Sequence, residues 1–202
     1  MKKYFYSFFI FLSCLFIQTH VYCENSSHTR VQLFSEVSEI HPAQPFWIAI
    51  QFEMDPHWHI YWKNPAESGM PTQIKWSLPD GFTVRELLWP APKKISISGI
   101  HSYGYENKAV LLAQIVPPKH LDSKHFKISA HIQWLECAEI CVPGNSNPEL
   151  LLPISFTPQA LPLQFQELFN SARSQIPLDL QDISFALHDS FLDPCLHKDL
   201  CQ

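Results

Sequence analysis

The segment Trp134-Leu135-Glu136-Cys137-Ala138-Glu139-Ile140-Cys141-Val142-Pro143-Gly144 decides how this chain is interpreted, because it places two cysteines four residues apart after an alternating run. Between residues 126 and 134, apolar and polar side chains alternate, which is the period-two pattern of a half-buried strand. The residues Val142-Pro143-Gly144 cannot continue a helix and are typical of a turn. The sequence therefore predicts a strand that ends at the cysteine pair.

The spacing of Cys137 and Cys141 limits how they can be bridged. On one straight strand, residues four apart are separated by roughly 13 Å, which is too far for a disulfide. If residues 138–140 form a tight hairpin loop, the two cysteines face each other with about 4.5 to 5.5 Å between Cα atoms, a distance that a disulfide spans. The strand pattern upstream favours this hairpin over a helix.

A bridge across so short a loop stabilises the fold only weakly, by about 2 kcal/mol in the chain-entropy model. The pair is therefore a candidate working redox pair, and the alternative is an ordinary structural disulfide in a secreted β-domain. A zinc site is disfavoured because the common tight spacing is C-x2-C and the sequence has no second pair of that kind.

Composition restricts the class of protein. The 202 residues are 46% hydrophobic and 16% charged, with a formal net charge of -5, so the chain has no basic surface for nucleic acid. Seventeen prolines and five glycines break the chain into short extended pieces, which favours a β-sandwich over a helical bundle.

Short apolar runs bounded by turn residues predict about eight strands, the pattern of an immunoglobulin-like antiparallel β-sandwich. In the segment 55–65, Trp58, Ile60 and Trp62 are expected on one face of a strand, and His57, His59 and Tyr61 on the other. Residues 64–71 are expected to form a loop. The remaining predicted strands are 30–40, 46–52, 73–78, 83–88, 109–116, 126–136 and 149–156.

Three regions are predicted along the chain. Residues 1–23 resemble a signal peptide, with two lysines before an apolar run and a cleavage site near Cys23-Glu24. Residues 24–158 form the sandwich. Residues 159–202 form a helical extension or the start of a truncated second module, with an amphipathic helix at 163–175 and one further strand at 183–187.

Removal of residues 1–23 leaves four cysteines in an exported protein, where disulfide chemistry is possible. Two of them are Cys137 and Cys141. The other two, Cys195 and Cys201, are expected to form a terminal bridge or to belong to a second module, and the sequence offers no physical basis for choosing.

Four motifs in order carry a family resemblance: HWHIYWKNPAESGMPTQIKW at 57–76, LLWPAPKK at 87–94, SYGYE at 102–106 and WLECAEICVPG at 134–144. Together they resemble the N-terminal periplasmic domain of the DsbD and ScsB thiol:disulfide interchange proteins, and the resemblance covers about residues 30–156. The resemblance implies an immunoglobulin-like fold, a periplasmic location and a redox-active disulfide in place of any other cofactor. Full-length relatives continue into a membrane electron-carrying region and a thioredoxin-like domain, so the chain is expected to be either a free-standing module or a truncated product.

The resemblance also implies the chemistry. Cys137 and Cys141 would receive electrons from a thioredoxin-like or membrane donor and pass them to oxidised periplasmic thiol-disulfide proteins, as a protein-disulfide reductase component. In the DsbD domains the second cysteine attacks, so Cys141 inherits the attacking role and Cys137 the resolving role. Three residues separate the cysteines here, where DsbD domains have five, and this shorter spacing resembles the ScsB branch. Because Glu136 and Glu139 are the nearest charged residues, and carboxylates disfavour a thiolate, we expect no unusually reactive thiol.

The loop 99–105 corresponds to the cap loop that shields the cysteines in DsbD domains. It contains the candidate cap residues His101, Ser102, Tyr103 and Tyr105. The capping phenylalanine of the family falls on Ser102, so Tyr103 or Tyr105 would have to replace it. The alternative is that both tyrosines only pack within the sandwich or a turn.

A second hypothesis belongs to a different class of function. His57 and His59, together with Cys137 and Cys141, could bind copper in an exported protein. Both histidines also fit surface or structural positions. In this hypothesis the protein is a copper-binding or protein-binding β-sandwich whose disulfide is purely structural.

Overall fold

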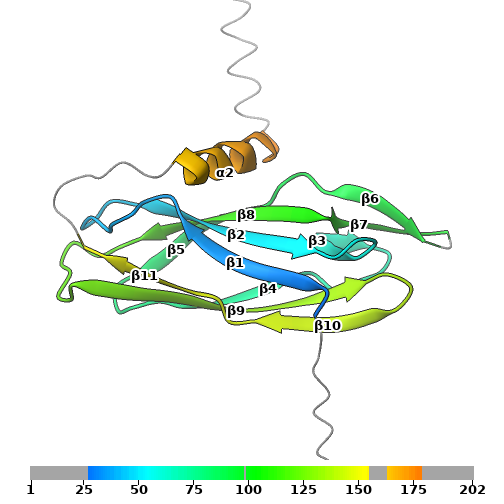
Figure 1. Ribbon diagram of the computed structural model, residues 1–202, viewed down its shortest axis with the longest axis horizontal. Coiled ribbons are helices and arrows are strands. Elements are labelled where there is room, and N and C mark those ends of the chain that lie inside the picture. The colour runs from blue at the N-terminus through cyan, green and yellow to red at the C-terminus, as the bar shows by residue number, and fades with distance from the viewer. Residues whose placement is uncertain (1–26, 98, 155–162, 179–202) are drawn as a thin grey trace, which may run out of the picture.

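The computed structural model describes residues 27–97, 99–154 and 163–178, and these residues form two antiparallel β-sheets packed as layers, with one helix on the outside (Figure 1). The first sheet has four strands in the order β1-β2-β8-β5. Their bounds are β1 (Thr29–Ser35), β2 (Phe46–Met54), β8 (Lys108–Val116) and β5 (Thr83–Leu88).

The second sheet is built around β9 (His125–Cys137), the longest strand described. One edge of β9 pairs with β10 (Cys141–Ser146) and β11 (Glu149–Pro153), and the other pairs with β3 (His59–Ala66) and β4 (Gln73–Ser77). Beyond β3 the sheet continues through β7 (Ile100–Glu106) to β6 (Lys93–Ile97). The end of β9 at Cys137 therefore lies between β10 and β3.

The core lies between the two sheets and is made by alternate residues of their central strands. Ile48, Ile50 and Phe52 of β2 are fully buried. Opposite them, Ile132 and Trp134 of β9 are also buried, and the rings of Phe52 and Trp134 meet edge to face with centroids 6.0 Å apart. This arrangement confirms the predicted immunoglobulin-like sandwich.

The helix α2 (Leu163–Ser174) covers the outer face of the four-stranded sheet (Figure 1). Its buried residues Phe169 and Ala172 pack against Ala49, Val110 and Leu112 of β2 and β8. The predicted helix at 163–175 is confirmed, and its apolar stripe has a partner because residues of β2 and β8 are apolar on both faces. Within the described residues, no helix has the length and apolarity needed to cross a membrane.

The first strand is shorter than predicted. It ends at Ser35, not at residue 40, because the hydroxyl of Ser35 accepts a hydrogen bond from the backbone N–H of Val37 and the chain bends there. Ile40 makes only an isolated bridge with Ile154.

Two segments predicted as a loop and a turn are strands. Residues 100–106 form β7, which pairs with both β3 and β6. The residues predicted as a turn after Cys141 lie in β10, where Pro143 is tolerated because β10 is an edge strand. Gly144 is required at its position because a Cβ there would lie 2.4 Å from the Trp134 ring.

The strand around the histidines also differs from the prediction. β3 begins at His59 and continues to Ala66, into the segment predicted as a loop, with a register shift between Tyr61 and Ala66. His57 precedes the strand in the left-handed region at φ 72°, so it does not share a strand face with His59.

The predicted strands at 46–52, 73–78, 83–88, 109–116 and 126–136 are confirmed, and the one at 149–156 is confirmed as far as residue 153. The predicted segments 1–23 and 183–187, together with Cys195 and Cys201, lie outside the described residues.

Candidate functional site

The two cysteines face each other across the β9–β10 hairpin. Cys137 and Cys141 are partners in the strand register, their Cα atoms are 4.1 Å apart, and their sulfurs form a disulfide. Ala138 closes the turn through a hydrogen bond from its backbone N–H to the carbonyl of Ile140. The hairpin predicted from the spacing is confirmed.

The two halves of the disulfide have different environments. Cys137 is 1% exposed because β3 pairs with the end of β9 that carries it. In this pairing, His59 of β3 lies opposite Cys137. Cys141 is exposed because it begins the edge strand β10. A thiol at position 141 is therefore open to another protein, whereas a thiol at position 137 is covered.

β3 places two polar side chains beside the buried sulfur. The hydroxyl of Tyr61 donates a hydrogen bond to Sγ of Cys137 over 3.2 Å. Nε2 of His59 lies 3.4 Å from the same hydroxyl oxygen, and the two rings meet edge on with centroids 5.3 Å apart. Because the two residues are separated by one position in a strand, they point to the same face, as the alternation predicts.

Burial controls the protonation of both groups. Desolvation lowers the pKa of His59, and the charge of Glu106 only partly opposes this shift. Desolvation also raises the pKa of Tyr61, against a smaller opposing effect from its hydrogen bond with Ser68. At neutral pH the imidazole is therefore neutral, and the phenol keeps the proton that it donates to the sulfur.

The loop after β3 packs onto Tyr61 and supports the site. Gly69 has φ of +104°, and a Cβ there would lie 2.3 Å from the Tyr61 ring. Only glycine allows this close contact. Beside it, the hydroxyls of Ser68 and Ser102 are 2.8 Å apart and hydrogen-bonded, which joins this loop to β7.

A cavity of about 270 Å³ lies directly against the disulfide. Its floor includes Tyr61, Ser102 and Cys137, and its rim includes Glu139 and Cys141. One wall is apolar and comes from isoleucines of the β6–β7 hairpin, namely Ile95, Ile97 and Ile100. The turns of the β9–β10 and β6–β7 hairpins lie at the same end of the sandwich, at the right in Figure 1.

The comparison with protein families identifies the domain. The family model described as "Thiol:disulfide interchange protein DsbD, N-terminal" matches residues 30–153. The chain belongs to this family. The match contains both strands of the hairpin and the disulfide, so the chain carries a thiol:disulfide interchange domain of the DsbD N-terminal type, whose redox group is a disulfide.

Solved structures of related domains match the chain at low sequence identity. The N-terminal periplasmic domain of ScsB from Proteus mirabilis matches with a TM-score of 0.57 and 21% identity, over 77% of this chain and 57% of that one. The reduced N-terminal domain of Neisseria meningitidis DsbD matches with a TM-score of 0.38 and 12% identity, over 64% of this chain and 90% of that one. The chain thus spans little more than half the length of the ScsB structure. No curated protein matches the chain.

The cap residues named from the DsbD resemblance lie on both faces of β7. Ser102 lines the cavity. Tyr105 points into the core, where its hydroxyl donates to the carbonyl of Pro90 over 2.8 Å. Tyr103 is partly exposed beside the Trp62 ring, and His101 is exposed and hydrogen-bonded to Ser96. The described residues that line the cavity therefore do not include Tyr103 or Tyr105. They include isoleucines at positions 95, 97 and 100 that were not predicted from the sequence. The signal that could have found them is this group of isoleucines just before and within the predicted cap loop.

The two glutamates near the cysteines have separate roles. Glu136 is 1% exposed and faces the core side of β9, where its carboxylate accepts hydrogen bonds from Trp134 Nε1 and the backbone N–H of His28, both over 2.9 Å. Ser27 donates a longer bond to the same carboxylate. Glu139 is exposed at the rim of the cavity. Of the two glutamates, Glu139 is the one that lines the cavity beside the disulfide.

The metal hypothesis receives no geometric support from the part of the chain that the structure describes. His57 is exposed in the turn before β3, and His59 is buried beside Tyr61. No group of three or more His, Cys, Asp or Glu side chains is placed to hold a metal ion within the described ranges.

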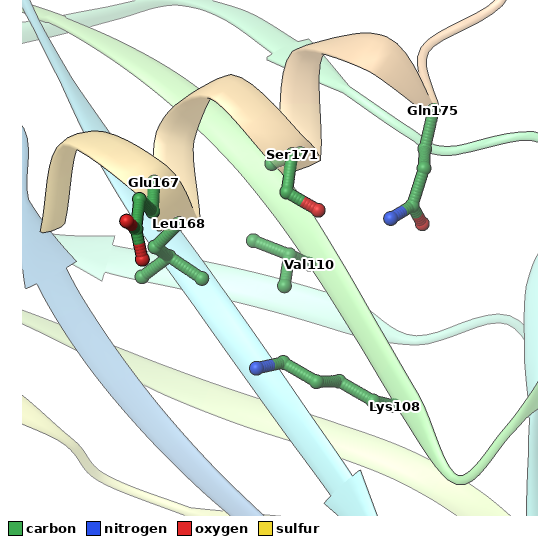
Figure 2. Close-up of a pocket in the computed structure, with 7 residues that line it drawn as sticks. Lys108, Val110, Glu167, Leu168, Ser171 and Gln175 are labelled. Atoms are coloured by element: carbon green, nitrogen blue, oxygen red, sulfur yellow. The ribbon is translucent and has the colours of Figure 1, made fainter. Parts of the chain in front are cut away.

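A second cavity, of about 340 Å³, lies on the opposite sheet between α2 and β8. Figure 2 shows the side chains of Leu168 from the helix and Val110 from the strand pointing into the space between these elements. Lys108 and Glu167 lie at its edges. The described residues that line it carry no thiol, so this cavity is separate from the redox site.

Proposed function

We propose that this domain is a periplasmic electron relay in which Cys141 attacks and Cys137 resolves. The observation that carries the proposal is the unequal exposure of the two sulfurs in one disulfide: Cys141 is open to solvent, whereas Cys137 is buried and hydrogen-bonded by Tyr61. The periplasmic location rests on membership of the DsbD family and on the ScsB domain, whose title calls it periplasmic.

The exchange moves two electrons to the partner. In the reduced domain, the Cys141 thiolate attacks one sulfur of an oxidised partner, whose disulfide breaks, and the second partner sulfur leaves as a thiolate and takes up a proton. Cys137 then loses its proton and attacks Sγ of Cys141. The Cys137–Cys141 disulfide forms, and the first partner sulfur leaves as a thiolate that is protonated in turn.

The domain is restored by the reverse reaction with a dithiol donor, which we propose to be a thioredoxin-like or membrane protein. Attack by the donor on the exposed sulfur of Cys141 expels Cys137 as a thiolate. Tyr61 stabilises this buried thiolate through its hydrogen bond, and the neutral ring of His59 adds no charge. The chain thus acts as a protein-disulfide reductase component.

The experiment that tests this assignment is mixed-disulfide trapping. The four other cysteines of the chain are first replaced by serine, and Cys137→Ser and Cys141→Ser are then compared with oxidised protein partners. Cys137→Ser should accumulate partner adducts, because the attacking thiol remains and the resolving thiol is absent. Adducts with Cys141→Ser alone would reverse the two roles.

The reduction potential separates a relay from a structural bridge. Equilibration of the same four-serine chain against glutathione or dithiothreitol buffers should give a value between about -120 and -270 mV, the range of known exchange proteins. A value below about -300 mV is that of a structural disulfide and would refute the relay.

A further inference from the structure

The cavity beside the disulfide has a composition that can select among oxidised partners. Ile97 and Ile100 are 47% and 48% exposed, so two apolar side chains stand open to solvent beside the reacting bond. Ile140, next to Cys141, is 67% exposed. Exposed apolar side chains gathered at one point of a surface mark a contact site.

The described polar groups that line the cavity offer no positive charge. The hydroxyls of Ser68 and Ser102 are hydrogen-bonded to each other, and Tyr61 donates to Cys137. Burial keeps His59 neutral by lowering its pKa. Among the described residues that line the cavity, the fixed charge is the carboxylate of Glu139 at the rim, and none is a lysine or an arginine. A carboxylate that entered would lose hydration without gaining a cationic partner.

We propose that this cavity selects protein disulfides whose reacting cysteine is flanked by an uncharged apolar residue, and that it discriminates against small anionic disulfides such as oxidised glutathione. The inference rests on the proposed relay and names the substrate class of its site. The isoleucine wall of Ile95, Ile97 and Ile100 receives the apolar side chain, and Glu139 repels the anionic disulfide.

The covalent step determines what occupies the cavity. When Cys141 Sγ bonds to a partner sulfur, the partner's disulfide breaks and its other sulfur leaves as a thiolate that takes up a proton. The partner residue next to its bonded cysteine is then one Cα–Cα step away, about 3.8 Å, and Cys141 itself lies on the cavity rim. A benzene ring fits a cavity of about 150 Å³, so a volume of about 270 Å³ accepts the side chain of leucine or phenylalanine.

The test uses the reduced full chain in which only Cys137 and Cys141 remain. Its oxidation is followed by stopped flow with four disulfides: two peptide dimers that differ only in leucine or aspartate beside the cysteine, oxidised glutathione, and the neutral bis(2-hydroxyethyl) disulfide. Each oxidation rate is expressed relative to the rate with bis(2-hydroxyethyl) disulfide. The leucine peptide should react roughly tenfold faster than the aspartate peptide, from the burial of one apolar side chain.

Variants locate the preference. In Ile97→Ser/Ile100→Ser the ratio of leucine to aspartate rates should fall toward one, whereas Leu151→Ser, which changes a side chain 66% exposed on β11, should keep it. In Glu139→Gln the relative rate with oxidised glutathione should rise several-fold at low salt.

The outcomes separate the two proposals. No reaction with any disulfide refutes the relay itself. Reaction with all four at similar relative rates refutes the selection and leaves the relay standing. A leucine preference that survives in the double isoleucine variant also refutes the assignment, because the preference then comes from another surface.

Discussion

The hydroxyl of Tyr61 donates a hydrogen bond to Sγ of Cys137 over 3.2 Å, from a neighbouring strand 76 positions away in the sequence. Reduction of the disulfide makes this sulfur a stronger acceptor, because a thiolate carries a full negative charge. In the proposed exchange, this contact would therefore stabilise the thiolate form of Cys137 more than the disulfide form.

Tyr61→Phe should slow release of the partner from the mixed disulfide. Hydrogen bonds to charged groups contribute about 1.5 to 3 kcal/mol, and a loss at the lower end corresponds to a roughly tenfold slower step. Rapid-quench measurement of the mixed disulfide gives this rate. Tyr103→Phe is the matched control, because it removes a hydroxyl of a partly exposed tyrosine that does not line the described cavity. Equal rates for both variants would contradict the role of the Tyr61 hydroxyl.

Gly69→Ala should disturb the same tyrosine from the opposite side. The added methyl would lie 2.3 Å from the Tyr61 ring, so the ring or the loop must move. We expect slower exchange in addition to the backbone cost of about 1 to 2 kcal/mol for a non-glycine residue in the left-handed region.

Gly99→Ala is the control for that backbone cost. Gly99 has φ of +84°, and nothing lies within 4 Å of an added Cβ. This variant should lose a similar amount of stability in chemical denaturation, and because it leaves the Tyr61 ring in place, it should slow exchange less than Gly69→Ala does. If both glycine variants slow exchange equally, the contact between Gly69 and Tyr61 is not the cause.

Glu136→Gln should destabilise the start of the described chain. The carboxylate accepts from Trp134 Nε1 with one oxygen and from the His28 N–H with the other, and an amide would direct its NH2 group toward one of these two donors. We expect a loss of about 1 to 3 kcal/mol in the free energy of unfolding and faster hydrogen exchange at the amide of His28. Glu139→Gln, on the exposed turn, should stay within about 0.5 kcal/mol; equal losses would contradict the prediction.

Stability should fall as the pH drops below the ordinary pKa of histidine. Burial lowers the pKa of His59 in the folded state from 6.5, so the unfolded chain binds the proton first. The contribution of His59 is complete above about pH 6.5 and declines as the pH falls toward the folded-state pKa. Chemical denaturation of the oxidised protein between about pH 7 and 5 gives the free energy of unfolding as a function of pH. The slope of this free energy against pH should be shallower in His59→Gln than in the unsubstituted protein. The slope should be unchanged in His125→Gln, which alters an exposed histidine at the start of β9; a shallower slope there too would contradict the assignment to His59.

Much of the fold could be predicted from local pattern. The alternation in residues 126–136 is strict because β9 buries one face, and it locates both the strand and the hairpin at its end. β7 was missed because its seven residues mix exposed and buried side chains without clean alternation. β10 was missed because proline and glycine normally end a strand, and here an edge position accepts the proline while the Trp134 ring leaves room only for glycine.

The sequence by itself determined the pair Cys137 and Cys141, the hairpin that joins them and the sandwich that carries them, because spacing and alternation are local properties of the chain. Only the tertiary structure decided which sulfur is buried, that Tyr61 donates to it, and that isoleucines of a distant hairpin form the wall of the cavity. These features arise from strand order. The pairing of β3 with β9 and with β7 brings together residues far apart in sequence, and no local pattern specifies that order.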